Sequence, residues 1–256
     1  MLRTRVIPCL LLRGESLVKT VKFDQFGYIG DPLNTCRIFN ELEVDEMTFL
    51  DITASREGRG PNYKILQEIT NECFMPLAYG GGLRDTAAAE RIFQIGFEKV
   101  VLNTAPFERP ALVTELSRAF GSQSVIVAVD VRRRLLGRYH VCGKSGTEEH
   151  RRDPVDWARE VEGLGAGEIL LTAIDREGTW NGFDVDLVRR VADAVSIPVI
   201  AHGGAGSVAD IGAVVREGHA SAVALGSLVV YQKKGLGVLV NFPDRAELGR
   251  ALEGAA

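Results

Sequence analysis

Two segments of this chain are similar in sequence but differ at one position that decides which chemistry they can perform. Val6–Arg13 aligns with Val125–Arg132, and Asp130 in the second segment corresponds to Leu11 in the first. A carboxylate can donate and accept a proton in general acid–base catalysis, whereas a leucine side chain cannot. This mismatch therefore bears directly on which reactions the protein can catalyse.

Two glycine runs are suited to binding phosphate. Each ends an apolar run and precedes a predicted helix: Gly80-Gly81-Gly82 and Gly203-Gly204-Ala205-Gly206. Glycine lets a ligand approach the backbone, and a helix N-terminus favours an anion. Polar residues after the next apolar run in each half would complete each cup: Asn103-Thr104 and Gly226-Ser227. Tight turns would explain one such run, but two at matched places favour a ligand with a phosphate at each end.

The elements that must position these residues alternate between short apolar runs and amphipathic stretches. Eight strands are expected: Arg5–Leu11, Glu46–Ile52, Pro76–Tyr79, Lys99–Asn103, Ser124–Asp130, Glu168–Thr172, Pro198–His202 and Ala222–Leu225. Eight strand–helix units with short loops predict a (β/α)₈ TIM barrel, with a doubly wound open sheet as the alternative. The internal similarity favours two homologous half-barrels, roughly residues 1–122 and 123–256, within one domain of residues 1–256.

Strand parity predicts a ring of charge at one end of the barrel. If Leu11 and Asp130 face the interior, alternate residues of each strand also face it. The first inward residue is then charged on four strands: Arg5, Glu46, Lys99 and Glu168. Because buried charges are costly unless paired, the four are expected to alternate in sign around a closed ring. Such a ring is either a stabilising plug or a gate, and the small apolar residues above it suit both.

Composition excludes several classes of function. The 256 residues carry 30 basic and 34 acidic side chains, a net charge of −4, which does not suggest binding to nucleic acid or to a membrane surface. The four cysteines lack metal-ligand or disulfide-framework spacing, so reduced thiols in a cytoplasmic protein are expected. The four histidines also lack metal-ligand spacing, and we expect neither a metal nor a cofactor.

Several motifs resemble those of the cyclase subunit of imidazole glycerol phosphate synthase, a ribulose-phosphate-binding type of barrel. The similarity covers essentially the whole chain, and these segments carry it: Phe49–Ser55, Gly80–Gly82, Phe120–Gln123, Gly167–Thr172 and Ile200–Gly206. The resemblance implies a heterodimer, in which a glutaminase docks at the N-terminal face of the barrel and supplies ammonia. The ammonia then passes through the barrel to a phosphorylated substrate at the opposite face.

The resemblance also implies roles for individual residues. Asp130 matches one of two acid–base aspartates of the family, while Leu11 stands where the other is expected. The charged ring matches the ammonia gate of the family, and Lys19 lies in the region of a flexible loop that reaches the substrate. The remaining residues expected to bind phosphate or substrate are Gly81, Gly82, Asn103, Thr104, Asp175, Glu177, Gly178, Gly203, Gly204, Gly226 and Ser227. Glu177 and His202 depart from the usual aspartate and serine of the family.

Three functions remain open. The segments Cys9–Gly14 and Val18–Phe23 resemble a paralogous branch associated with sugar amidation for surface polysaccharide such as lipopolysaccharide. In that branch a third, amide-transferring enzyme receives the ammonia. The alternatives are an authentic cyclase of histidine biosynthesis and a non-catalytic conduit that activates its glutaminase.

Overall fold

Eight parallel strands close into a barrel in the computed structural model, which describes residues 4–134 and 137–253. In order around the barrel they are β1 (Arg5–Arg13), β4 (Met47–Asp51), β5 (Leu77–Gly80), β6 (Lys99–Leu102), β7 (Val125–Arg133), β10 (Glu168–Ala173), β11 (Val199–His202) and β12 (Ala222–Leu225). β1 pairs in parallel with both β4 and β12, and β7 pairs with β10, so the sheet has no open edge. The predicted (β/α)₈ barrel is confirmed.

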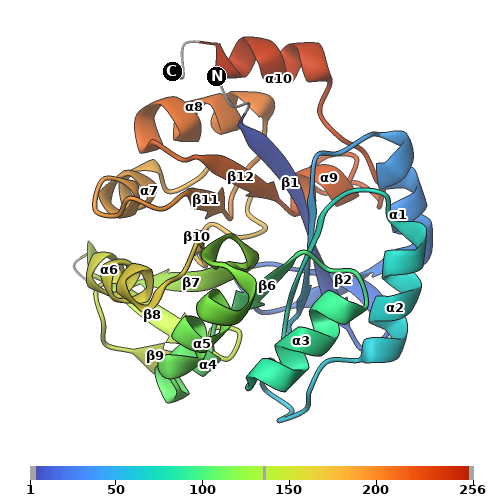
Figure 1. The fold of residues 1–256 in the computed structure, drawn as a ribbon. Helices are drawn as coiled ribbons and strands as arrows, with labels where there is room; N and C mark the ends of the chain where they lie inside the picture. The colour runs from blue at the N-terminus through green and yellow to red at the C-terminus, as the bar shows by residue number, and fades with distance from the viewer. Residues whose placement is uncertain (1–3, 135–136, 254–256) are drawn as a thin grey trace.

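Helices form an outer layer around the strands (Figure 1). Their bounds are α1 (Pro32–Glu41), α2 (Tyr63–Glu72), α3 (Thr86–Gln94), α4 (Ala105–Glu108), α5 (Ala111–Phe120), α6 (Pro154–Leu164), α7 (Val185–Ala192), α8 (Val208–Gly218), α9 (Ser227–Val230) and α10 (Arg245–Leu252), with a 3₁₀ turn η1 at Ser122–Ser124. Side-chain caps fix where several begin, as Asp85 accepts from Ala88 N and Ser207 from Asp210 N. No helix among the described residues is both long and apolar enough to cross a membrane.

Side-chain alternation along the strands divides the apolar residues into two cores. Outward residues such as Leu10, Val127 and Leu171 pack beneath the helices. Inward residues form a separate cluster along the barrel axis: Ile7, Cys9, Ala78, Val101, Ile126, Ala128, Leu170, Ile200, Ala222 and Ala224. The predicted strand parity is therefore confirmed, because the charged ring and Asp130 lie on the same strand faces as this inner cluster.

Two hairpins at the carboxyl ends of the barrel strands replace loops that the sequence predicted. β1 continues to Arg13 and pairs with β2 (Ser16–Thr20), which pairs with β3 (Phe26–Gly30). β7 continues to Arg133 and pairs with β8 (Tyr139–Gly143) and then β9 (Glu148–His150). The prediction that Lys19 lies in a flexible loop was wrong, because it belongs to β2 and is only 6% exposed.

Asp51 stands at the end of β4, on the opposite face of the strand from Leu50. Asp51 pairs in register with Leu12, an outward residue, and not with Leu11. Its carboxylate accepts from the backbone N–H groups of Thr53 and Ala54, both at 3.1 Å. Asp51 thus points away from the barrel axis and caps the turn that follows its strand.

Candidate functional site

The four charged residues at the amino ends of the strands form a closed ring of ion pairs. Arg5 contacts Glu46 at 2.6 Å and Glu168 at 2.9 Å, and Lys99 contacts the same two carboxylates at 3.1 and 3.3 Å. Glu46 is the most buried member, with a side chain 5% exposed. Each charge therefore has two opposite neighbours, which offsets the cost of removing it from water.

Small and apolar side chains line the axis of the barrel above this ring. They come from all the barrel strands, and Leu50 packs against the inner cluster from β4. Cys9 is buried in the same cluster, and burial raises the pKa of its thiol to about 12. An apolar lining of this kind favours a neutral molecule over an ion.

A pocket opens at the carboxyl ends of the strands, directly above the inner cluster. Leu11, Asp130, Thr172 and His202 lie in its wall, together with Gly81 and Gly82 of the first glycine run. Burial raises the pKa of Asp130 to about 7, and the hydroxyl of Thr172 opposes this shift by hydrogen bonding to the carboxylate. Such a carboxyl exchanges protons near neutral pH, as a general acid or base requires.

His202 is another titratable group in the wall of the pocket. Its Nδ1 lies 3.2 Å from the hydroxyl of Thr172. Burial, and the nearby ammonium of Lys19, lower the pKa of His202 to about 3, so its imidazole is neutral at physiological pH. Leu11 is also buried, and it presents only methyl groups to the pocket. The family resemblance implies a second carboxylate at this position.

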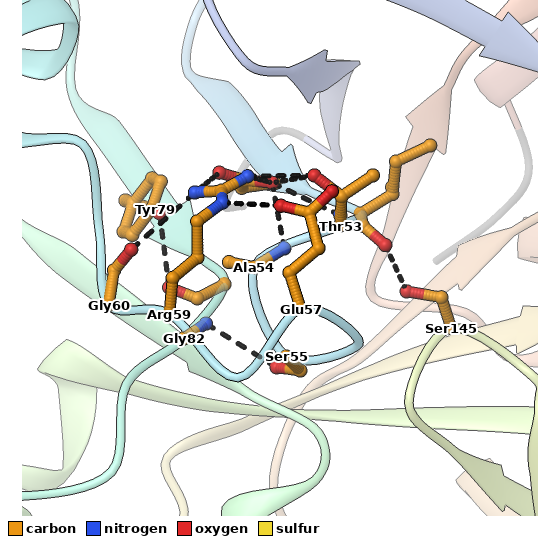
Figure 2. A network of polar contacts seen from close by, with 12 residues as sticks. Thr53, Ala54, Ser55, Glu57, Arg59, Gly60, Tyr79, Gly82 and Ser145 are labelled. Atoms are coloured by element: carbon orange, nitrogen blue, oxygen red, sulfur yellow. Dashed lines mark hydrogen bonds and ion pairs between the residues drawn. The ribbon is translucent and has the colours of Figure 1, made fainter.

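The first glycine run is held by a polar network behind it. Arg59 binds Asp51 with two nitrogens, at 2.7 and 2.9 Å, and its third nitrogen binds Glu57 at 2.7 Å. Figure 2 shows Arg59 between Glu57 and Gly60, with Ser55 reaching Gly82. Gly82 has φ +68°, and a Cβ there would lie 2.5 Å from the Arg59 carbonyl oxygen. Only glycine fits this close approach between the two loops.

The second glycine run forms a smaller cavity on the other side of the mouth. Its wall contains Lys19, Glu177, Gly178, Gly203, Gly204, Gly226 and Ser227. Gly204 has φ +111°, and a Cβ there would lie 2.2 Å from the Gly182 carbonyl oxygen. The second glycine run is therefore like the first, because its backbone leaves no room for a side chain at Gly204.

Lys19 and Glu177 form a buried ion pair at this second cavity. Glu177 also accepts from the Thr20 hydroxyl at 3.0 Å and from Phe23 N at 3.2 Å, so it ties the β2–β3 hairpin to the barrel. Burial lowers the pKa of Lys19 to about 7, and the interaction with Cys9 partly opposes that decrease. The Lys19 side chain lies directly beside Gly226.

The tips of the two hairpins meet above the pocket. A Cβ on Gly146 would lie 3.1 Å from the ring of Phe23, and Ser145 donates to the Ile52 carbonyl at 2.7 Å. Phe23, Lys144 and Ser145 all line the pocket. The two hairpins therefore form a partial roof over the pocket.

The remaining predicted residues lie in different environments. Asn103 and Thr104 line the pocket, but the Asn103 amide donates to Asp130 at 3.2 Å and to the Ala128 carbonyl at 3.1 Å. Asp175 lies outside the walls of both cavities, where it accepts from Arg133 N at 2.6 Å. The structure therefore brings together all the predicted binding residues except Asp175.

Sequence reasoning missed three residues of the site. Arg59 and Asp51 support the first glycine run, and Thr172 joins Asp130 to His202. Arg59 gave no periodic or motif signal, because its role depends on a turn that returns to the end of its own strand. Among the described residues, no group of three or more His, Cys, Asp or Glu side chains could hold a metal ion.

Comparison with known proteins gives a consistent result. The histidine biosynthesis protein family matches residues 5–235. The "Putative imidazole glycerol phosphate synthase subunit hisF2" of Pseudomonas aeruginosa is 49% identical over 244 residues, which are 95% of this chain and 97% of that protein. The corresponding hisF3 protein of Vibrio vulnificus is 46% identical over 99% of this chain and 98% of its own length. The "Imidazole glycerol phosphate synthase subunit HisF" of Alkaliphilus metalliredigens is 43% identical over 91% of this chain and 92% of its own.

These matches extend over almost the whole barrel, including the charged ring, the pocket and both glycine runs. These relatives are named as HisF subunits of imidazole glycerol phosphate synthase, and the chain therefore belongs to the histidine biosynthesis protein family.

Proposed function

We propose that this chain is the synthase-type subunit of a glutamine amidotransferase. It takes ammonia from a glutaminase docked at the charged ring and delivers it to a phosphorylated ligand in the pocket. The observation that carries the proposal is the arrangement along one axis: a closed charged ring, a small apolar bore and a pocket that contains Asp130. The relatives are named as subunits of a synthase, which supports a heterodimer with a glutaminase.

The phosphorylated ligand is expected to span the mouth of the barrel. The two glycine runs lie in the walls of separate cavities that share Glu177 and His202. A ligand with a phosphate at each end would place its central atoms between them, beside Asp130. Glycine backbones that no side chain can cover are suited to hydrogen bonding with phosphate oxygens.

We further propose that imidazole-ring formation is weak in this chain, and that the ammonia serves a different acceptor, such as a sugar destined for surface polysaccharide. Ring formation in the family that this chain resembles uses two carboxylates, and Leu11 stands in the place of one of them. The loss of a general acid or base costs a factor of about 10²–10⁴ in rate.

Exposed apolar residues beside the mouth support the docking of a third protein, the enzyme that would transfer the ammonia to the sugar. Six large apolar side chains are exposed on the β2–β3 hairpin and on the nearby segment 236–239: Val21, Phe26, Tyr28, Leu236, Val238 and Leu239. A Cβ on Gly27 would lie 3.6 Å from the Tyr231 hydroxyl, and Tyr231 forms a β-bridge with Val238, so the two segments are neighbours. Contiguous apolar surface of this kind is typical of protein interaction sites.

The test compares the two nitrogen sources and the binding of ligand. The chain is combined with the glutaminase subunit of the same organism, and imidazole formation from the bisphosphate substrate of the family is measured with glutamine and with ammonium salt. We expect the bisphosphate to bind, as read by calorimetry, with little ring formation from either source. Rapid ring formation would support the authentic cyclase instead. Failure to bind the bisphosphate would contradict the proposed pocket.

A further inference from the structure

Three polar side chains lie next to one another on adjacent strands at the floor of the pocket. Asp130 on β7 pairs in register with Thr172 on β10, which pairs in register with His202 on β11. All three are buried, with exposed fractions of 8%, 1% and 6%. Since inward residues at one level of a parallel barrel are neighbours, the three side chains form one row.

Thr172 lies in the middle of this row. Its hydroxyl lies 3.2 Å from His202 Nδ1 on one side, and on the other side Asp130 is its neighbour in register, where Thr172 opposes the rise in the pKa of the carboxyl. Among the described residues none hydrogen-bonds the second ring nitrogen of His202, Nε2, and His202 lies in the wall of both cavities. A hydroxyl has one proton to donate, so Thr172 can donate to only one of its two partners at a time.

We propose that Asp130, Thr172 and His202 form a proton relay, in which His202 Nε2 is the group that exchanges a proton with the bound ligand. The relay rests on the proposed function in one respect, that a ligand occupies this pocket. Thr172 is a positioning residue within it. Nothing in the names of the relatives assigns a role to Thr172 or to His202.

The direction of the hydrogen bonds follows from the charge of Asp130. When Asp130 is ionised it must accept, so Thr172 donates to it and His202 Nδ1–H donates to Thr172. His202 Nε2 then carries a lone pair and acts as a base towards the pocket. When Asp130 is protonated, its O–H donates to Thr172, Thr172 donates to His202 Nδ1, and Nε2 carries the proton.

One transfer through the relay is balanced in atoms and charge. His202 Nε2 takes a proton from the ligand as its Nδ1 proton moves to the Thr172 oxygen and the Thr172 proton moves to Asp130. The ligand loses one proton and Asp130 gains one, while the imidazole stays neutral throughout. Burial is consistent with this scheme, because it disfavours the charged form of both His202 and Asp130.

The charged and titratable groups around the row are consistent with a neutral imidazole. Lys19 and Glu177 lie on the far side of His202 and share the second cavity with it. Cys9 lies below on β1, and burial raises the pKa of its thiol to about 12, so it stays protonated. Asn103 donates to Asp130 Oδ2 at 3.2 Å and holds that carboxylate in position.

The relay does not restore the arrangement that Leu11 removes. His202 stands two strands from Asp130 around the barrel, whereas Leu11 on β1 stands four strands away, across the mouth. A base at His202 therefore approaches the ligand from a different side than a carboxylate at position 11 would. This geometry fits proton transfer at one region of the ligand and agrees with weak ring formation.

Nitrogen NMR of the histidine-labelled chain, without glutaminase or ligand, tests the relay. The two neutral tautomers of histidine give distinct Nδ1 and Nε2 shifts, and the resonance of His202 is identified by its loss in His202→Gln. We expect His202 to stay neutral from pH 5 to 9 and to change from the Nε2–H to the Nδ1–H tautomer as pH rises. The midpoint should lie near 7, the value to which burial raises the pKa of Asp130.

Substitutions then separate the relay from a structural role. Thr172→Val should abolish the pH-dependent tautomer change, Thr172→Ser should retain it, and Asp130→Asn should leave one tautomer at every pH. A tautomer that ignores pH in the unsubstituted chain, or a change that survives Thr172→Val, would overturn the relay. Adding the bisphosphate should shift the Nε2 resonance, and no shift would overturn the contact with ligand. The proposed function is tested separately, by measuring whether the chain stimulates its glutaminase. An absence of stimulation would contradict the proposed function and leave the NMR result unaffected.

Discussion

Glu46→Gln perturbs the charged ring with almost no change in side-chain shape. Glu46 receives Arg5 at 2.6 Å and Lys99 at 3.1 Å, and its side chain is 5% exposed. Glutamine can still accept a hydrogen bond but carries no charge. The substitution therefore leaves two cations, Arg5 and Lys99, to share the single carboxylate of Glu168.

The expected loss of stability follows from how far each partner is buried. Removal of one member of a fully buried ion pair costs roughly 3–5 kcal/mol, because the other charge stays buried and unpaired. Water partly solvates the unpaired cations here, since the side chains of Arg5 and Lys99 are 28% and 16% exposed. We therefore expect a loss of about 2–3 kcal/mol in the free energy of unfolding. For a domain of this size that corresponds to a decrease of about 4–12 °C in Tm.

Urea and thermal unfolding measure this loss against a matched exposed pair. Glu115→Gln breaks the contact with Arg109 at 2.7 Å, where the side chains are 39% and 48% exposed, and should cost less than about 1 kcal/mol. Adding Lys99→Met to Glu46→Gln should recover part of the stability, since it removes one unpaired cation. Equal unfolding midpoints for Glu46→Gln and Glu115→Gln would refute the reasoning that the ring is a coupled, buried network.

Three further predictions concern the pocket. Leu11→Asp should raise ring formation from ammonium salt, since a general acid or base contributes a factor of about 10²–10⁴, and an unchanged rate would show that the pocket also differs elsewhere. Gly82→Ala should weaken bisphosphate binding at least about tenfold in calorimetry, because its Cβ would lie 2.5 Å from the Arg59 carbonyl oxygen. Gly163→Ala, which meets nothing within 4 Å, should leave that binding unchanged, and equal affinities for both variants would contradict the close-approach argument. Burial raises the pKa of Asp130 from 3.8 to about 7, so the folded state holds the Asp130 proton more tightly than the unfolded state does. This proton contributes its full stability below about pH 4, and the contribution is lost as the pH rises to 7. Asp130→Asn should flatten that part of the urea-midpoint profile, and an identical profile would contradict the shifted pKa.

The barrel was predictable because apolar residues recur with different periods in its strands and its helices. Apolar runs such as Leu77–Gly80 and Val199–His202 are short, and each is followed by a capped helix, so their number and order could be read directly. Alternation along the strands also predicted which four charges share the axis. The ion pairs between them then followed from the cost of burying an unpaired charge.

The hairpins were harder to predict, because they continue strands that were expected to end at the mouth. β1 reaches Arg13 and β2 begins at Ser16, so Gly14 occupies a two-residue turn. A glycine between residues that alternate in polarity is a hairpin signal, and it was present in the sequence. The buried positions of Lys19 and Thr20 could not be read from it, since they depend on Glu177, more than 150 residues away in the chain.

The row from Asp130 to His202 shows a different limit. Each residue stands on a different strand at the mouth of the barrel, and the sequence predicted Asp130 and His202 there. Their connection depends on the register between β7, β10 and β11, which strand prediction alone does not supply. Thr172 therefore entered the site only when the strands were placed side by side.

Stimulation of glutamine hydrolysis tests the central proposal most directly. The glutaminase subunit of the same organism is assayed alone, with this chain, and with the Glu46→Gln variant, in each case without the bisphosphate. A subunit that receives ammonia at the charged ring should increase hydrolysis at least about tenfold, with a smaller increase for Glu46→Gln and a full one for the Glu115→Gln control. Hydrolysis that does not respond to the intact chain would contradict the proposed role as an ammonia-receiving subunit.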